Sequence, residues 1–68
     1  SVVWDSVGQR LATGSDDNTA RIWDVYTGKC LAVLHMDALV WSVAWSPDGQ
    51  WLALGCDDGR VLWVRVRV

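Results

Sequence analysis

The side chains best suited to chemistry in this sequence are one His, two Cys and eight Asp. His35 could form a nucleophilic pair with Cys56 or with an Asp. A zinc site needs about four ligands, usually Cys or His, and these three side chains lack the paired spacing of such a site. The pairs Asp16-Asp17 and Asp57-Asp58 could suggest calcium, but Asp is also a turn-former, and we favour turns. No metal site is therefore expected, and the six Gly form no phosphate-binding motif.

Length and composition limit the classes of protein that remain. A chain of 68 residues forms one small domain at most. With 51% hydrophobic and 21% charged residues, it is not a disordered chain. The net charge of −2 and the lack of a basic tract argue against a nucleic-acid partner, and no apolar run is long enough to span a membrane. Two Cys fit a reduced compartment better than a secreted disulfide scaffold, so we expect a cytoplasmic protein.

An internal repeat organises the chain. Residues 1–17 align with residues 42–58 at an offset of 41, and ten of the 17 aligned residues are identical. With one deletion, the alignment continues and places Ile22-Trp23 over Leu62-Trp63. A period near 40 residues is typical of propeller blades or of helical repeats.

The apolar segments are short and rich in Val, Ile and Trp, which favours strands over helices. Turn residues separate them about every ten positions, which favours antiparallel hairpins and an all-β fold. One segment, Met36 to Ala44, also has helical spacing, but its end repeats the strand-like Val2–Trp4. The expected strands are Ser1–Trp4, Arg10–Ser15, Ala20–Val25, Lys29–Leu34, Val40–Trp45, Trp51–Cys56 and Arg60–Arg67.

Several of these strands are apolar on both faces. Trp41–Trp45 and Trp51–Leu54 do not alternate cleanly, and a sheet that is apolar on both sides must be covered on both. The pattern therefore predicts small sheets stacked between other sheets. Val64–Val68 differs because it alternates strictly, which predicts a strand with one wet face.

Two stretches, Gly8–Asp24 and Ser42–Gln50, resemble the WD-repeat (tryptophan–aspartate) β-propeller family. The resemblance implies antiparallel four-stranded propeller blades around a central channel. It implies a complete first blade in residues 1-34 (strands A to D) and a second, incomplete blade in residues 35-68 (strands A to C). The chain would then be a fragment or an oligomerising piece of a propeller.

The resemblance also implies a buried hydrogen-bond network in each blade, made by a His, a Ser or Thr, an Asp and a Trp. The members carried over to this chain are Ser15, Asp17 and Trp23 in the first blade and His35, Cys56, Asp58 and Trp63 in the second. Such a network accounts for the single His, so we expect no enzyme and no cofactor. Trp4, Trp23, Trp45 and Trp63 are expected in the core, whereas Trp41 or Trp51 is the candidate for an exposed contact.

By the same resemblance the chain is a protein–protein interaction scaffold that binds a protein or peptide through its loops. The implied contact residues are Asp16, Met36, Asp37, Leu39, Trp41 and Asp57. Their mixture of acidic, apolar and aromatic groups suits a basic or amphipathic peptide. The alternative is a self-assembling structural unit, whose partners are further WD-repeat blades or copies of itself. Four copies would give about eight blades, which is within the family range.

Overall fold

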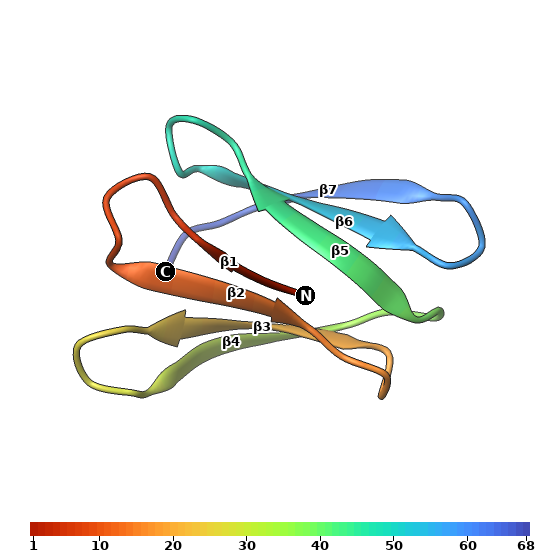
Figure 1. The fold of residues 1–68 in the computed structure, drawn as a ribbon, viewed down its shortest axis with the longest axis horizontal. Coiled ribbons are helices and arrows are strands. Elements are labelled where there is room, and N and C mark those ends of the chain that lie inside the picture. The colour runs from red at the N-terminus through yellow and green to blue at the C-terminus, as the bar shows by residue number, and fades with distance from the viewer.

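The computed structural model describes all residues 1–68 and contains strands and turns but no helix (Figure 1). The expectation of an all-β fold is confirmed, and the helical alternative for the segment around Met36 to Ala44 is wrong. No helix is present that could cross a membrane. The strands are β1 (Val2–Trp4), β2 (Arg10–Gly14), β3 (Thr19–Asp24), β4 (Cys30–His35), β5 (Val40–Trp45), β6 (Trp51–Cys56) and β7 (Val61–Arg65).

The strands form two antiparallel sheets, which we call the first blade (β1–β4) and the second blade (β5–β7). Within each blade, every strand pairs with the next one along the chain. The tight turns follow from local chemistry: Gly49 has a φ of 71° and its N–H donates to the Ser46 carbonyl at 2.9 Å. Glycine adopts this left-handed conformation without steric cost, so the turn closes the β5–β6 hairpin. The division at residues 34 and 35 stays a prediction.

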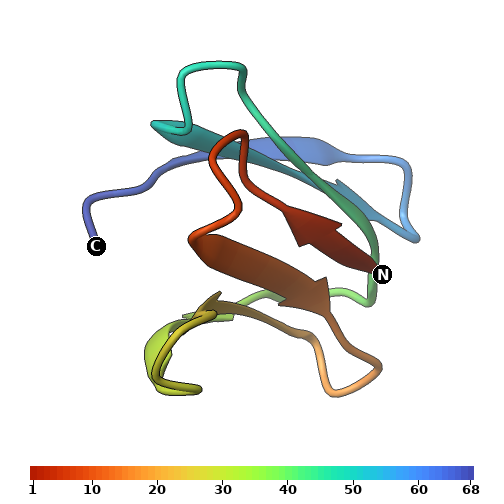
Figure 2. The ribbon, with the colours of Figure 1, turned by 60° about the vertical axis from the view of Figure 1, so that its left-hand side comes forward.

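The two blades pack face to face on one shared core (Figures 1 and 2). Its fully buried side chains include Ala12 and Ile22 from the first blade and Leu52 and Leu54 from the second. The blades approach closely at Gly14, where a Cβ atom would lie 3.0 Å from the Val40 side chain. Gly14 on the first blade thus leaves room for Val40 of the second, and the close packing of the two blades removes apolar surface from water.

The edge strands β1 and β5 contact each other across this interface (Figure 1). The indole Nε1 of Trp45 on β5 donates to the Val3 carbonyl on β1 at 3.1 Å. The Val43 N–H also donates to the Ser1 hydroxyl at 3.4 Å. These contacts align the two blades along the same edge.

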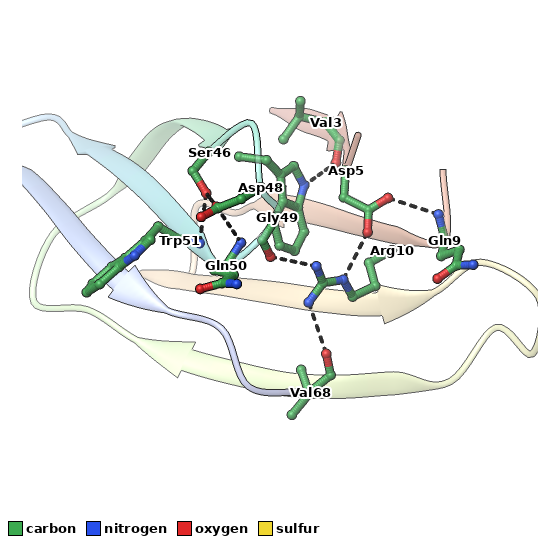
Figure 3. Close-up of polar contacts among 11 residues, drawn as sticks. Val3, Asp5, Gln9, Arg10, Ser46, Asp48, Gly49, Gln50, Trp51 and Val68 are labelled. Atoms are coloured by element: carbon green, nitrogen blue, oxygen red, sulfur yellow. Dashed lines mark hydrogen bonds and ion pairs between the residues drawn. The ribbon is translucent and has the colours of Figure 1, made fainter. Parts of the chain in front are cut away.

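Arg10, at the start of β2, also joins the two blades, next to Trp45 (Figure 3). Its Nε donates to the Asp5 carboxylate at 2.9 Å, and its two terminal nitrogens donate to the carbonyls of Val68 at 3.0 Å and Gly49 at 2.6 Å. The guanidinium also lies 4.6 Å from the centre of the Trp45 ring, within range for a cation–π interaction. One side chain therefore connects both blades and the C-terminal residue.

Asp5 holds Arg10 in this position. The Asp5 side chain is only 1% exposed and also accepts a hydrogen bond from the Gln9 N–H at 2.9 Å. Burial acts to raise the pKa of Asp5, but the hydrogen bonds and charge of Arg10, together with the Gln9 bond, outweigh it and lower the pKa. A buried carboxylate is tolerated here because it is fully paired.

The pairing register corrects the sequence alignment in β7. In both blades the offset of 41 holds through the third strand, since Ile22 pairs with Ala12 just as Trp63 pairs with Ala53. Trp63 therefore occupies the position of Ile22, not that of Trp23. A shift of one residue places a side chain on the other face of its sheet.

Two Trp expected in the core are exposed. Trp63 is 63% exposed because the register turns it away from the first blade. Trp4 is 57% exposed because it lies on the face of the first blade that the second blade does not cover. Trp23 and Trp45 are half-buried.

The C-terminal strand is shorter than expected. β7 ends at Arg65, and Val66 is buried with its N–H donating to the Gln50 carbonyl at 2.7 Å. The tail then crosses to the first blade, where Arg10 binds the Val68 carbonyl (Figure 1). The prediction of one continuous strand with one wet face over Val64–Val68 is therefore wrong. These residues form the end of β7 and the tail that crosses to the first blade.

We predict that Arg10→Ala lowers the free energy of unfolding by about 3 kcal/mol, because it leaves the Asp5 carboxylate buried without its partner. Arg60 is a matched control, since it forms two ion pairs but is exposed. Arg60→Ala should cost less than about 1 kcal/mol. Urea unfolding followed by circular dichroism measures both values, and equal losses would contradict the role given to Arg10.

The lowered pKa of Asp5 predicts an acid-dependent contribution to stability. A group with a lowered pKa stabilises the fold above its unfolded pKa of about 3.9, and this stabilisation is lost as the pH falls through the folded pKa. The stability difference between the wild type and Asp5→Asn should therefore shrink between about pH 5 and pH 2. Urea unfolding at a series of pH values tests this, and a difference independent of pH would refute it.

Candidate functional site

Three loops meet at one end of the two blades because successive strands run in opposite directions. They are residues 15–18 between β2 and β3, 36–39 between β4 and β5, and 57–60 between β6 and β7. The Met36 N–H donates to the Asn18 carbonyl at 2.7 Å, and the Asp57 N–H donates to the Leu39 carbonyl at 3.0 Å. We call these loops together with Trp41 the acidic end. The hydrogen bonds join its loops into one surface.

Five of the eight Asp lie at the acidic end: Asp16, Asp17, Asp37, Asp57 and Asp58. Arg60 bridges two of them, since it pairs with Asp37 and its Nε lies 2.6 Å from the Asp58 carboxylate. The hydrogen bond and charge of Arg60 lower the pKa of Asp37, and Asp37 and then Asp58 raise the pKa of Arg60 in turn. Acidic groups therefore outnumber basic ones on this surface at neutral pH.

Trp41 is the most exposed indole of the chain at 71%. It lies at an irregularity of β5, where the pairing with β6 shifts between Val40 and Ser42. A residue in such a bulge is left out of the regular ladder, which turns its side chain away from the sheet. The structure thus presents a large aromatic group beside the loops, as expected for Trp41 as one of the two candidates.

The other predicted contact residues divide by exposure. Asp16, Asp37 and Asp57 are exposed, whereas Met36 and Leu39 are half-buried, and Met36 packs against the shared core. The acidic and aromatic groups are therefore the accessible part of the surface. Binding by all six residues stays a prediction.

The predicted network of the first blade has only local contacts in the structure. The Asp17 N–H lies 3.4 Å from the Ser15 hydroxyl, and the Asp17 carboxylate accepts the Thr19 N–H at 3.1 Å. Hydrogen bonds from the Thr19 and Ser15 hydroxyls lower the pKa of Asp17. Asp17 and Ser15 thus order the turn before β3.

The hydroxyl that Trp23 contacts is that of Thr13, which sequence reasoning missed. The Trp23 indole Nε1 donates to Thr13 Oγ1 at 3.2 Å. Trp23 pairs with Leu11 on β2, so Thr13 is its diagonal neighbour on the same face. The sequence does show that Thr13 lies two residues after Leu11. That spacing points to Trp23 only once the pairing of Leu11 with Trp23 is known.

The structure brings none of His35, Cys56, Asp58 and Trp63 into a side-chain hydrogen bond with another of the four. His35 is exposed at the end of β4, and Cys56 is buried against the first blade. Asp58 pairs with Arg60, and Trp63 lies on the opposite face from Cys56. Leu54 occupies the position equivalent to Thr13, so the second blade also lacks that hydroxyl.

No group of three or more His, Cys, Asp or Glu side chains is arranged to hold a metal ion. Cys30 and Cys56 are both free. The expectations that the chain has no metal, no cofactor and no catalytic residue stay predictions, as does the expectation that nucleic acid is not a partner.

Comparison with known proteins finds relatives that are named for ribosome biogenesis. The chain is 46% identical over 57 residues to the ribosome biogenesis protein BOP1 of Mus musculus, covering 81% of this chain and 8% of the relative. It is 40% identical over 62 residues to a BOP1 homolog of Arabidopsis thaliana, covering 91% and 8%, and 48% identical over 48 residues to one of Monosiga brevicollis, covering 71% and 6%. The chain thus spans less than a tenth of the length of these relatives.

The expectation of a cytoplasmic protein is wrong. The relatives are named for ribosome biogenesis, a process that belongs to the nucleolus and nucleus. Two reduced Cys are compatible with any reducing compartment of the cell, so the cysteine argument could not separate the cytoplasm from the nucleus.

The family is shown by a match to most of the chain. The WD domain, G-beta repeat family matches residues 1–24 and 28–63. The first matched segment contains β1–β3, and the second contains β4–β6 and most of β7, so each segment contains one copy of the internal repeat. The chain belongs to the WD40-repeat family.

Proposed function

We propose that this chain is part of a protein-interaction scaffold that serves ribosome biogenesis in the nucleus. The similarity to proteins named for ribosome biogenesis supports the process. The WD-repeat family supports the scaffold role. Because the chain matches only a small part of each relative, the proposal concerns the contribution of these two blades to such a scaffold.

The acidic end is the surface that we assign to the partner. Trp41 supplies a rigid, exposed aromatic group, and Trp is enriched among the residues that dominate binding energy. The surrounding Asp16, Asp37 and Asp57 are exposed carboxylates that favour a positively charged partner. The exposure of Trp41 beside a group of carboxylates is the observation that supports this assignment most directly.

The partner proposed is a basic protein segment that carries an apolar or aliphatic side chain. The apolar group would cover the Trp41 indole, and its Lys or Arg residues would lie near the carboxylates. Charges at the rim of an interface increase the association rate and make it depend on salt. The loops are already tied by hydrogen bonds, so little ordering is needed on binding.

We predict that Trp41→Ala reduces binding to ribosome precursor particles at least about ten-fold, as truncation of a central aromatic residue does. The tagged chain would be expressed in eukaryotic cells, and its share in the precursor fractions of a sucrose gradient would be measured. Tyr26→Ala is the control, because Tyr26 is an exposed aromatic residue at the other end of the blades.

Three outcomes of this experiment would contradict parts of the proposal. If the wild type does not sediment with the precursor particles, the assigned process is wrong. If it does and Trp41→Ala sediments equally well, the acidic end is not the contact surface. Loss of binding with Tyr26→Ala would place the contact at the opposite end.

A further inference from the structure

Arg60 is the only Lys or Arg in the three loops of the acidic end. Its guanidinium pairs with carboxylates from two different loops, since Asp37 lies between β4 and β5 and Asp58 lies between β6 and β7. Nε donates to the Asp58 carboxylate at 2.6 Å, and Nη2 donates to that of Asp37. The surface that we assign to a basic partner therefore already holds one cationic group of its own.

The internal repeat shows that the turn before β7 does not need an arginine at this position. The offset of 41 places Arg60 over Thr19 and Asp58 over Asp17. In both turns the backbone N–H of the later residue donates to the Asp carboxylate at 3.1 Å. The Thr19 hydroxyl completes the first turn by donating to Asp17 at 2.5 Å. In the second turn the Arg60 guanidinium replaces this hydroxyl and is long enough to reach Asp37 as well.

The loops do not depend on Arg60 for their position. The Asp57 N–H donates to the Leu39 carbonyl at 3.0 Å, which joins the same two loops through the backbone. The side chains of Arg60, Asp37 and Asp58 are 44%, 75% and 42% exposed. Exposed ion pairs are weak because water and salt screen the charges, and they change an equilibrium by no more than about five-fold. The contact between Arg60 and Asp37 can therefore open without disturbing the loops.

The exposed carboxylates around Arg60 divide into two kinds. Asp16 and Asp57 form no ion pair, so they are open to a partner. Asp37 and Asp58 share the guanidinium of Arg60. A second cationic group at this shared pair would be repelled by the first. A basic side chain of the partner uses the shared pair only where it replaces Arg60.

We propose that Arg60 competes with a basic side chain of the partner for Asp37 and Asp58, and so limits the affinity of the acidic end. This inference rests on the proposed function, because it concerns the same surface and the same kind of partner. A Lys or Arg of the partner that binds at this pair displaces the Arg60 guanidinium into solvent. Removal of the Arg60 side chain therefore strengthens binding, whereas removal of a contact residue weakens it.

The test measures the affinity of a synthetic peptide, Arg-Arg-Leu-Arg-Arg, by NMR titration of the Trp41 indole N–H. The signal is identified by its absence from Trp41→Ala. Arg60→Thr is the matched variant, because Thr19 stands at the same position of the first-blade turn. It should bind the peptide about two- to five-fold more tightly than the wild type. The spectrum of each variant shows whether it is folded, and Arg60→Gln takes the place of an unfolded Arg60→Thr.

Two comparisons separate local competition from a general effect of net charge. Lys29→Thr removes the same charge from the loop between β3 and β4, at the opposite end of the blades. It should bind as the wild type does, because salt screens charges that are far apart on an exposed surface. Asp37→Asn should weaken binding more in Arg60→Thr than in the wild type, where Arg60 already occupies Asp37. Asp57→Asn should weaken binding equally in both, because Asp57 forms no ion pair with Arg60.

Three results would overturn the inference while the wild type still binds the peptide. Arg60→Thr would bind no more tightly than the wild type, Lys29→Thr would gain as much as Arg60→Thr, or Asp37→Asn would have the same effect in both backgrounds. A wild type whose Trp41 signal does not respond to the peptide would instead overturn the proposed function, and this inference with it.

Discussion

The structure depends on holding two thin sheets against each other, and Arg10 is a side chain that contacts both of them. Its guanidinium binds a buried carboxylate, two backbone carbonyls and an indole ring at once. Neither Asp5 nor Arg10 has a like residue at the repeated position, where Ser46 and Trp51 stand. We call these contacts of Arg10 the Arg10 clamp. It is specific to this pair of blades and does not follow from the repeat.

Apart from the Arg10 clamp, the arrangement of the two sheets follows from the internal repeat. The constant offset of 41 residues gives both blades the same register, so equivalent residues of the two repeats lie on equivalent faces of their sheets. The shared core joins the face of the first blade that carries Ala12 and Ile22 to the face of the second blade that carries Leu52 and Leu54. The two remaining faces carry exposed Trp side chains, among them Trp4 and Trp63. Membership of the WD40-repeat family agrees with this arrangement of repeated sheets.

The sequence was sufficient for the strands, the turns and the family, because these follow from local chemistry and from the repeat. It was not sufficient for Trp63. The alignment with one deletion placed Trp63 over Trp23, whereas the pairing register places it over Ile22, on the opposite face of the sheet. Thr13 was missed as the partner of Trp23 because their contact is diagonal and depends on the register. The Arg10 clamp joins residues 39 and 58 positions apart, and no local pattern indicates such contacts.

Native-state hydrogen exchange of the monomer at high dilution is the most direct test of whether the Arg10 clamp and the shared core make the two blades one cooperative unfolding unit. The account predicts that the slowest amides of β2 and β3 exchange with the same free energy of opening as those of β5 and β6, because neither blade keeps its core without the other. Arg10→Ala should lower both values together. Two distinct free energies, with one blade opening while the other stays protected, would contradict the account.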